Sequence, residues 1–383
     1  MTSVAGSAVR DIDCLVIGGG LAGGMAGLRL ARAGHGVLLV ERERESHAKV
    51  CGEFLSPEAV RYLRAAGVDP LACGAERVHR LRLTAGRRCV ETALPFSAQS
   101  VSRALLDETL LTRAKEHGCD ILRGVSVESA VRDSTGWTAR LSDGQSVRAG
   151  NLFLATGKHD LRGWSRPAGK HNDLVGFKMH WRLAPEQVRQ LRLSIELFLF
   201  EGGYGGLSLV ENDTANLAWV VRKRVLAAQG GWSGLLTRVC AQCPGVEQRL
   251  HGANPLWERP MAIAPIPYGY LARESDGAWR IGDQAAVIPS FTGDGMAIAL
   301  HSASLAAEMF LAGESADLYQ RALAAQLRRG MALAVVLSRL MTTPAARRLA
   351  PGLLRILPPV LRWVAAATRI PAHALSAQTL ELK

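Results

Sequence analysis

The chain has 383 residues, 48% of them hydrophobic, and 46 Lys and Arg residues against 34 Asp and Glu residues give a formal net charge of +12. This length exceeds one typical core, so we expect two domains, and the apolar content excludes a disordered chain. The basic residues are spread along the chain without an aromatic-interleaved run, which argues against nucleic-acid binding. The charge fits an anionic cofactor, an acidic partner or an anionic membrane surface.

The seven cysteines are irregularly spaced, which argues against a disulfide framework and fits a reducing cytoplasm. Cys240 and Cys243 form a CxxC without a second pair, so we interpret them as structural thiols and expect no metal site. Residues 1–13 lack the apolar core of a signal peptide, and the hydrophobic region 349–367 contains arginines and prolines. We therefore expect neither secretion nor a membrane-spanning helix.

Residues 14–40 follow the pattern of a strand, a glycine-rich turn, a helix and a second strand, with Gly18, Gly20 and Gly23 forming GxGxxG. In such a unit Gly18 permits a tight turn, Gly20 lets the backbone approach a pyrophosphate, and Gly23 lets helix and strand pack closely. The helix N-terminus supplies unpaired N–H groups for phosphates. The alternative is a glycine-rich turn without a ligand.

Glu41 ends the second predicted strand, where a carboxylate is expected to bind a ribose diol and to repel an added 2′-phosphate. We assign Arg42, the next residue, to the same site. These residues predict a dinucleotide whose adenosine lacks that phosphate, and they do not separate FAD from NAD.

Residues 279–302 read WRIGDQAAVIPSFTGDGMAIALHS and resemble the second FAD motif of the aromatic hydroxylase (p-hydroxybenzoate hydroxylase-like) and geranylgeranyl reductase superfamily of FAD-dependent oxidoreductases. The resemblance implies that Asp283 binds the ribityl chain and that the backbone of 293–296 faces the pyrimidine end of the flavin. A helix N-terminus there would stabilise the negative charge of the reduced ring. The cofactor residues assigned by position in this motif are Asp283, Pro289, Gly293, Asp294, Gly295 and Met296.

Residues 49–57, KVCGEFLSP, are similar to the KxCGE-type loop of geranylgeranyl reductases, which borders the flavin. The resemblance implies that Gly52 lies close to the ring, that Cys51 lies near the substrate, and that Glu53 or Lys49 handles protons or steers charge. Arg103 is similar to the family's arginine at the start of the helix beside FAD, where it would bind pyrophosphate or ribityl oxygens. The alternatives are a solvated loop with a buried thiol and a solvated helix start.

Residues 175–182, VGFKMHWR, alternate like a strand, with Phe177 and Trp181 on one face and His180 on the other. In the superfamily this strand belongs to the substrate sheet, so His180 is a candidate base, with a histidine on the sheet surface as the alternative. The glycine-rich residues 202–207 predict a hairpin of that sheet. Tyr204 and Tyr268 either line the pocket or simply pack.

Thr156 precedes Gly157 where hydroxylases that use NADPH carry an Asp-Gly pair. We assign Gly157 to the cofactor, but this departure argues against a fixed hydroxylase-type NADPH site. NADPH or NADH, a separate reductase, or the substrate itself then remain as electron donors. The aromatic pattern that geranylgeranyl reductases carry in the substrate sheet is also missing, and the glycine-rich hairpin at 202–206 stands in its place.

The resemblance implies an α/β fold in which a Rossmann-type FAD-binding domain is interleaved with a mixed β-sheet substrate domain. The expected segments are 11–76, 101–158 and 271–315 for the FAD domain, and 77–100 and 159–270 for the substrate domain. A C-terminal helical region, 316–383, carries arginines at seven-residue intervals (Arg348, Arg355, Arg362 and Arg369). This region is interpreted as a packed helical cap or as a surface that docks on lipid or guards an apolar substrate.

The leading functional interpretation is an FAD-dependent monooxygenase or dehydrogenase that modifies a hydrophobic aromatic, polyketide or prenyl-lipid substrate. The alternatives are reduction of isoprenoid double bonds, modification of side chains of a partner protein, and an FAD-binding scaffold without turnover. We expect a cytoplasmic protein, with peripheral contact at the inner membrane surface as an open alternative.

Overall fold

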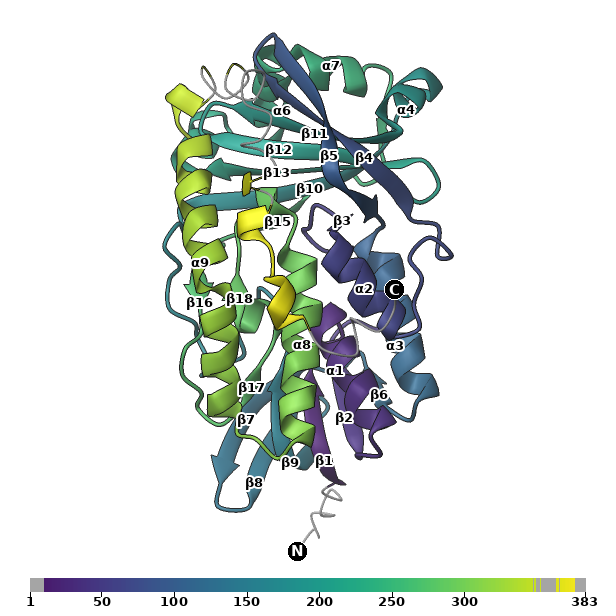
Figure 1. Ribbon diagram of the computed structural model, residues 1–383, viewed down its shortest axis with the longest axis vertical. Coiled ribbons are helices and arrows are strands. Elements are labelled where there is room, and N and C mark those ends of the chain that lie inside the picture. The colour runs from purple at the N-terminus through teal and green to yellow at the C-terminus, as the bar shows by residue number, and fades with distance from the viewer. Residues whose placement is uncertain (1–9, 347, 349–351, 353–362, 365, 376–383) are drawn as a thin grey trace, which may run out of the picture.

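The computed structural model describes residues 10–346, 348, 352, 363, 364 and 366–375. Two β-sheets lie at opposite ends of an elongated molecule, and a long helix runs along both (Figure 1). Of the arginine stripe predicted for the C-terminal region, Arg355 and Arg362 lie outside the described residues.

The first sheet, at the lower end of Figure 1, has a parallel core. Its strand order is β6–β2–β1–β9–β8–β7, with β17 paired to β9, and β7, β8 and β9 joined in antiparallel fashion. The bounds are β1 (Arg10–Ile17), β2 (Val37–Glu41), β6 (Asp120–Arg123), β7 (Val127–Asp133), β8 (Gly136–Leu141), β9 (Ser146–Leu154) and β17 (Trp279–Arg280). Every residue of β2 is buried, as expected for a parallel strand with both faces covered.

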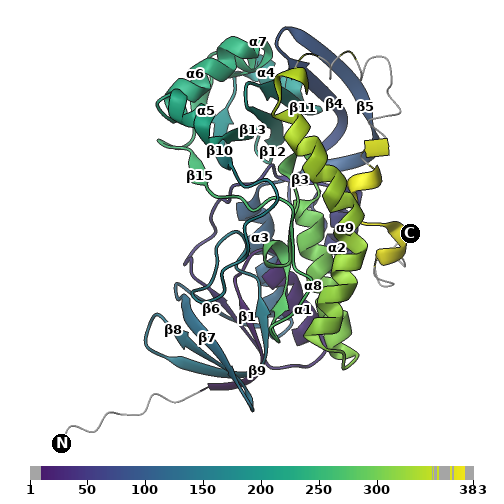
Figure 2. The ribbon, with the colours of Figure 1, turned by 90° about the vertical axis from the view of Figure 1, so that its left-hand side faces the viewer.

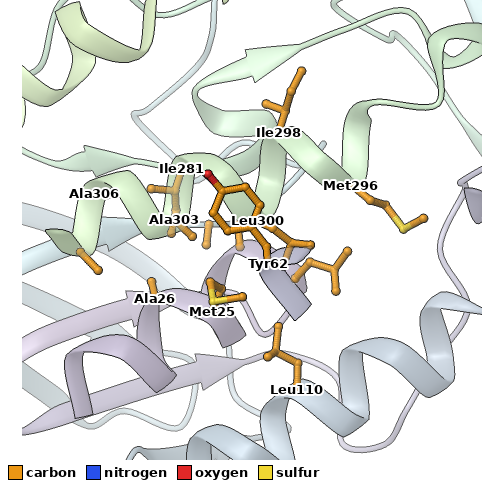
Figure 3. Packing of buried hydrophobic residues seen from close by; sticks show 14 of the residues in the cluster. Met25, Ala26, Tyr62, Leu110, Ile281, Met296, Ile298, Leu300, Ala303 and Ala306 are labelled. Carbon is orange, nitrogen blue, oxygen red and sulfur yellow. The ribbon is translucent and has the colours of Figure 1, made fainter. Parts of the chain in front are cut away.

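Side chains that alternate along these strands pack into two hydrophobic cores, one on each face of the first sheet. Val16 and Leu39 face the helices α1 (Leu21–Arg32), α2 (Pro57–Ala65), α3 (Arg103–Glu116) and α8 (Gly295–Leu311), whereas Leu15 and Leu38 face the curled hairpin β7–β8. Figure 3 shows the helical side, where Ala26 and Met25 of α1 lie near Ala303 and Leu300 of α8. Small residues at this contact let the helices that carry the cavity walls approach closely.

The second sheet has the order β14–β10–β13–β12–β11–β4–β5–β3, with β15 paired to β10. Its neighbouring strands are antiparallel except for β11 and β4, which are parallel. The bounds are β3 (Phe54–Leu55), β4 (Glu76–Ala85), β5 (Arg88–Ser100), β10 (Leu174–Arg182), β11 (Leu193–Phe200), β12 (Gly203–Val210), β13 (Thr214–Arg222), β14 (Asn254–Pro255) and β15 (Met261–Ile263). Strands β4 and β5 lie between α2 and α3 in the chain, so the two sheets are interleaved in sequence.

Four short helices cover the outer face of the second sheet (Figure 2): α4 (Pro185–Leu191), α5 (Lys223–Ala228), α6 (Trp232–Gln242) and α7 (Pro244–Leu250). Phe177, Met179 and Trp181 pack into this outer core, as the alternation of β10 predicts. The other face of β10 turns Lys178 and His180 toward the first unit, where both are buried.

The remaining elements connect the two sheets. They are β16 (Tyr270–Leu271), which pairs with β18 (Ala286–Val287), the short 3₁₀ turns η1 (Gly282–Gln284), η2 (Ser290–Thr292) and η3 (Ala372–Ala374), and the long helix α9 (Ala316–Met341). Ser315 caps α9 by accepting a bond from the Leu318 backbone. None of the described helices is long and apolar enough to cross a lipid bilayer. The predicted fold class is confirmed.

Candidate active site

A cavity of about 930 Å³ lies between the two sheets, bordered by the start of α1, the loop before β3 and the start of α8. Most of the residues singled out in the sequence line it: Gly18, Gly20, Glu41, Arg42, Lys49, Cys51, Gly52, Glu53, Arg103, Gly157, Asp283, Gly293, Gly295 and Met296. Gly23, His180, Pro289 and Asp294 are outside its lining among the described residues. One cavity therefore gathers segments that lie far apart in sequence.

The turn before α1 requires glycine for steric reasons. Gly18 has φ of 107°, and a Cβ there would lie 2.5 Å from the carbonyl oxygen of Ala155. A Cβ on Gly23 would lie 1.8 Å from the carbonyl oxygen of Gly18. Gly23 therefore acts through packing behind the turn, while Gly20 and Leu21 bring the N-terminus of α1 to the cavity.

Two cations meet beside this helix terminus. Asp107 accepts bonds from Arg103 Nε at 2.7 Å and from Lys49 Nζ at 2.9 Å. A Cβ on Gly20 would lie 3.3 Å from the Arg103 guanidinium and 3.4 Å from Lys49 Nζ, so both charges border the backbone of the turn. Burial alone would raise the pKa of Asp107, but Arg103 and Lys49 hold it below its ordinary value. Lys49, predicted to handle protons or steer charge, thus lies beside the N-terminus of α1, and its partner Asp107 was not among the predicted site residues.

Glu41 is buried at the end of β2 and lines the cavity. Its carboxylate accepts bonds from the backbone N–H of Gly19 at 2.6 Å and of Glu43 at 3.0 Å. Each carboxylate oxygen can accept more than one bond, so a hydroxyl in the cavity can still bind here.

Asp283 lies in the turn η1 and accepts a bond from Lys158 Nζ at 2.9 Å. Arg166 donates to the carbonyl oxygen of Asp283 at 2.6 Å. Burial would raise the pKa of Asp283, but Lys158 and then Arg166 outweigh it and lower the pKa. Sequence reasoning missed Lys158, although its place directly after Gly157 puts it at the end of β9 beside the motif.

Glu53 lines the cavity, and its carboxylate is bonded by other parts of the protein. It adopts the left-handed conformation, with φ of 57°, and its side chain is fully buried. One carboxylate oxygen accepts bonds from Lys178 Nζ and from the backbone N–H of Arg103, the latter at 2.7 Å. The other oxygen bonds His180 Nε2 at 2.8 Å. Although burial favours the neutral acid, His180 and Lys178 lower the pKa of Glu53, so the carboxylate fastens the loop to β10.

The residues between these anchors face the cavity. Cys51 Sγ accepts a bond from the Glu53 N–H at 3.3 Å, and the Cys51 carbonyl accepts one from Asn216 at 3.2 Å. Gly52 is exposed, and a Cβ built on it would meet no described atom within 4 Å. The protein therefore leaves open space at Gly52, on the side where the resemblance puts the flavin ring.

His180 contacts the cavity indirectly, through the ring of Trp257. Its ring stacks on Trp257 with centroids 4.8 Å apart, and Trp257 lines the cavity. His180 itself is buried behind that ring. The geometry favours a supporting role for this histidine over direct contact with a ligand.

The start of α8 forms a second glycine-rich wall. Gly293 has φ of 74°, and a Cβ there would lie 2.6 Å from the ring of Phe54, so glycine is required. Gly295 and Met296 line the cavity, but Asp294 turns into the protein near Thr368 and Arg369. Burial raises the pKa of Asp294 to about 7, with Arg369 opposing the increase.

Beyond the glycines the cavity becomes apolar. Half-buried or buried side chains from three strands form this wall, which is defined by Leu81 of β4, Leu94 and Phe96 of β5, and Ile195 and Leu197 of β11. Tyr204 and Tyr268 also line the cavity and bring phenol groups into these surroundings. Burial raises the pKa of Tyr268 to about 12 and that of Tyr204 further, so both remain protonated at neutral pH.

These features fit FAD along the length of the cavity. The α1 terminus with Arg103 and Lys49 suits a diphosphate, and the carboxylates of Glu41 and Asp283 suit ribose and ribityl hydroxyls. The open space at Gly52 leaves room for a planar ring beside the loop.

Comparisons with known proteins agree with this assignment. Residues 11–152 match the FAD binding domain family. A menaquinone reductase of Mycolicibacterium smegmatis is 28% identical over 355 residues, covering 87% of this chain and 85% of that protein. A probable electron transfer flavoprotein-quinone oxidoreductase, YdiS of Escherichia coli, is 26% identical over 347 residues, covering 82% and 79%.

Solved structures show the same fold. PqsL, a probable FAD-dependent monooxygenase from Pseudomonas aeruginosa, superposes with a TM-score of 0.70 at 20% identity, covering 90% of this chain and 100% of that chain. The flavin-dependent brominase Bmp2 gives a TM-score of 0.75 at 17% identity, covering 97% of each chain.

Proposed function

We propose that this FAD-dependent oxidoreductase, which resembles the superfamily of aromatic hydroxylases and geranylgeranyl reductases, reduces an isoprenoid lipid of the quinone class. The observation that carries the proposal is the apolar wall of the cavity, formed by Leu81, Leu94, Phe96, Ile195 and Leu197. An apolar surface of this kind suits a long hydrocarbon tail. The sequence relatives named as quinone reductases support the same substrate class.

Different residues of the chain would bind the cofactor and position the loop beside it. Arg103 and Lys49 bind the diphosphate, and Glu41 and Asp283 bind hydroxyls of the cofactor, as their positions along the cavity support. When bound, reduced FAD would supply a hydride. Cys51 and Gly52 would border the reacting atoms, while Glu53, with His180 and Lys178 behind it, holds their loop in place.

Residues near the C-terminus that border the cavity support peripheral contact with a membrane. Val364 and Arg369 line the cavity, and Trp363, next to Val364, is 61% exposed. Tryptophan is favoured at the boundary between lipid and water. We propose that this region faces the inner membrane surface and that an apolar tail passes from there to the cavity.

Mass spectrometry of the product tests the proposal. Anaerobic enzyme, photoreduced in the presence of menaquinone in detergent micelles, should be reoxidised by the lipid. A quinol product returns to the starting mass after mild oxidation, whereas a hydrogenated tail keeps two added hydrogens. If isoprenoid quinones of several tail lengths leave the reduced flavin unchanged, the proposed substrate class is wrong.

A pair of variants links the reaction to the apolar wall. Ile195→Asn, in the wall, should raise KM for the lipid about 10-fold because it adds a polar group to an apolar contact. Val131→Asn, at a 64% exposed position of β7, is the matched control and should leave KM unchanged. Equal KM values for the two variants would show that the apolar wall does not contribute to binding of the lipid.

A monooxygenase acting on an aromatic compound is the second candidate. The observation that favours it is the pair of protonated phenols, Tyr204 and Tyr268, which can position a polar ring in the cavity. NADPH, NADH or a separate reductase would then supply electrons. Reaction of the reduced enzyme with ¹⁸O₂ and a panel of phenols and anilines tests it, since label in the product identifies an oxygenase.

A further inference from the structure

A surface pocket of about 580 Å³ lies at the C-terminal end of α9, and it shares no lining residue with the active-site cavity. In Figure 1 this end of α9 lies beside the second sheet. The pocket, which we call the α9-end pocket, is formed by the segment before β10, the end of β13 and the end of α9. Its described lining residues are Lys170, His171, Asn172, Asp173, Arg222, Val336, Arg339, Leu340 and Thr343.

Cations outnumber carboxylates in the wall of this pocket. Lys170, Arg222 and Arg339 line it, and Asp173 is the single carboxylate among its described lining residues. Arg222 donates to Thr342 Oγ1 at 3.1 Å, and Arg339 donates to the carbonyl oxygen of Lys170, so both guanidinium groups are held at the wall. These cations offset the partial negative charge of the helix end. The pocket therefore keeps positive charge for an anion.

Two nitrogen atoms of the wall make no hydrogen bond within the described part of the chain. They are Nε2 of His171, whose side chain is 5% exposed, and Nε of Arg222. The carboxylate of Asp173 lies 3.1 Å from the first and 3.8 Å from the second. This side chain is 48% exposed, so it can turn toward solvent and leave both nitrogen atoms to another oxyanion. Because buried donors are normally satisfied, the pair indicates a place for an acceptor.

The hydrogen bond on the other side of the imidazole suits this interpretation. His171 Nδ1 hydrogen-bonds Ser338 Oγ at 3.2 Å. When the Ser338 hydroxyl donates to Nδ1, the hydrogen of a neutral imidazole is on Nε2. Burial, as the largest influence, lowers the pKa of His171, which favours this neutral form. His171 then supplies a donor to the pocket without adding a charge.

Exposed apolar side chains lie beside these charges. Val336 is 54% exposed and Leu340 is 53% exposed, and both line the pocket. They are four positions apart, so they project from the same face of α9. Residues 318–341 contain four arginines and no Asp or Glu. A helix face that joins exposed aliphatic groups to cations is typical of surfaces that bind anionic lipid.

We propose that the α9-end pocket binds the phosphate group of an anionic phospholipid, while Val336 and Leu340 enter the acyl region of the same bilayer. A phosphate has enough acceptor oxygen atoms to bond several donors of the wall at once. The choice of a lipid over a soluble phosphate rests on the exposed apolar pair, because a soluble anion gains nothing from aliphatic groups at the rim of its site.

The site adds a second contact to the membrane-facing region proposed around Trp363. The segment that follows Trp363 packs on α9, where a Cβ on Gly330 would lie 2.9 Å from the carbonyl oxygen of Thr368. Val336, at the pocket, lies less than two turns farther along the same helix. The headgroup site extends that membrane contact, and it is independent of the reaction proposed for the cavity.

Vesicle flotation of the holoenzyme tests the site. Vesicles of phosphatidylcholine with phosphatidylglycerol should bind the protein at least about 10-fold more tightly than vesicles of phosphatidylcholine alone. Lys170→Gln should weaken binding to the anionic vesicles about 5-fold, because it removes one cation from the headgroup site. Lys170 is exposed, so this variant should fold and keep its FAD.

Arg140→Gln is the matched control for the same change of charge. Its side chain is 69% exposed, and it lies on β8, at the opposite end of the molecule from the pocket (Figure 1). It should bind the anionic vesicles like the unaltered protein. Equal losses in Lys170→Gln and Arg140→Gln would show a general attraction of a basic protein to the vesicles and would overturn the headgroup site.

A gain of binding is expected when the carboxylate of the wall is removed. Asp173→Asn should strengthen binding to the anionic vesicles about 5-fold, because a negative charge leaves the pocket. Asp143→Asn, at an exposed position of the turn between β8 and β9, is the control and should have no effect. Unchanged or weaker binding of Asp173→Asn would contradict an anion at this place.

Inorganic phosphate distinguishes a lipid from a soluble anion. In protein labelled with ¹⁵N-histidine, phosphate should shift the Nε2 resonance of His171, which His171→Gln identifies. Val336→Asn/Leu340→Asn should keep this shift but weaken vesicle binding at least about 10-fold, because both aliphatic groups are lost. Normal vesicle binding of the double variant would make the pocket a site for a soluble phosphate and refute the lipid. Absence of the shift would overturn the anion site itself.

The outcomes separate this proposal from the proposed function, whose assay uses detergent micelles. If isoprenoid quinones are not reduced but Lys170→Gln weakens vesicle binding, the lipid site stands and only the substrate assignment fails. If the quinones are reduced and Lys170→Gln binds vesicles like Arg140→Gln, the proposed function stands and the lipid site is wrong.

Discussion

Lys49 and Glu53 are four positions apart, yet they belong to two different ion clusters. Lys49 joins Asp107 and Arg103 beside the N-terminus of α1, where its side chain is 26% exposed. Glu53 joins Lys178 and His180 on the second sheet, where it is fully buried. The loop is thus fixed at one end to each structural unit, and residues 49–53 all border the cavity.

The charges of the two clusters serve different purposes. The Lys49 cluster has more cations than anions at a helix N-terminus, so it retains positive charge for an anionic ligand. The Glu53 carboxylate is fully buried and bonds three partners, so we expect its charge to hold the backbone. Charged residues in one short loop therefore need not share one chemical role.

The largest effect is expected for Lys178→Met, which breaks the Glu53 cluster. It leaves a fully buried carboxylate with fewer partners, and we expect about 3–5 kcal/mol less free energy of unfolding. Urea denaturation measures it. The double variant Lys178→Met/Glu53→Gln should recover part of the loss because it removes the unpaired charge. A loss below about 1 kcal/mol for Lys178→Met would show that the cluster does not fasten the loop.

Asp294 is a buried carboxylate like Glu53, but its pKa is raised whereas that of Glu53 is lowered. Its pKa is raised to about 7, so between about pH 4 and pH 7 the folded protein holds a proton that the unfolded chain has lost. Stability from this group therefore falls as pH rises through that range. Asp294→Asn should remove this decrease, which amounts to about 4 kcal/mol. Urea denaturation at several pH values measures it, and parallel pH profiles of both proteins would contradict the raised pKa.

Arg103→Gln tests the Lys49 cluster with a smaller effect. Loss of a charged donor at the diphosphate position should weaken FAD binding about 10–100-fold. It should also lower the free energy of unfolding of the apoprotein by about 1–3 kcal/mol, because the buried Asp107 loses two bonds and keeps only Lys49. Titration of apoprotein with FAD gives the affinity. Arg113→Gln, on the same helix but directed at exposed Glu116, is the control. Unchanged affinity would place the diphosphate elsewhere.

The smallest effect is expected for Cys51→Ser, in the middle of the loop. The change nearly keeps the volume of the side chain, so the FAD content should be unchanged. The free energy of unfolding should stay within about 0.5 kcal/mol of that of the unaltered protein. Turnover or the rate of flavin reoxidation should change, because Cys51 lines the cavity. Unaltered kinetics with several substrates would show that the thiol does not contact reacting groups.

Local sequence predicted the parts of the site that depend on short-range sterics. The turn at Gly18 and the close packing at Gly23 follow from the spacing of the glycines, because a Cβ at either place collides with nearby backbone. The alternation of β10 likewise predicted that Phe177 and Trp181 share one face. The motif at 279–302 indicated the second glycine wall, of which Gly293 and Gly295 line the cavity.

The sequence by itself determined the FAD-binding fold and the glycine turns that border the cavity, since glycine turns and strand alternation are properties of neighbouring residues. Only the tertiary structure decided the partners of the charged groups. Lys49 meets Asp107 across 58 positions, and Glu53 meets Lys178 across 125. A buried charge takes whichever counter-ion the packing of distant elements places within hydrogen-bond reach, and burial then decides whether that charge binds a ligand or holds the backbone.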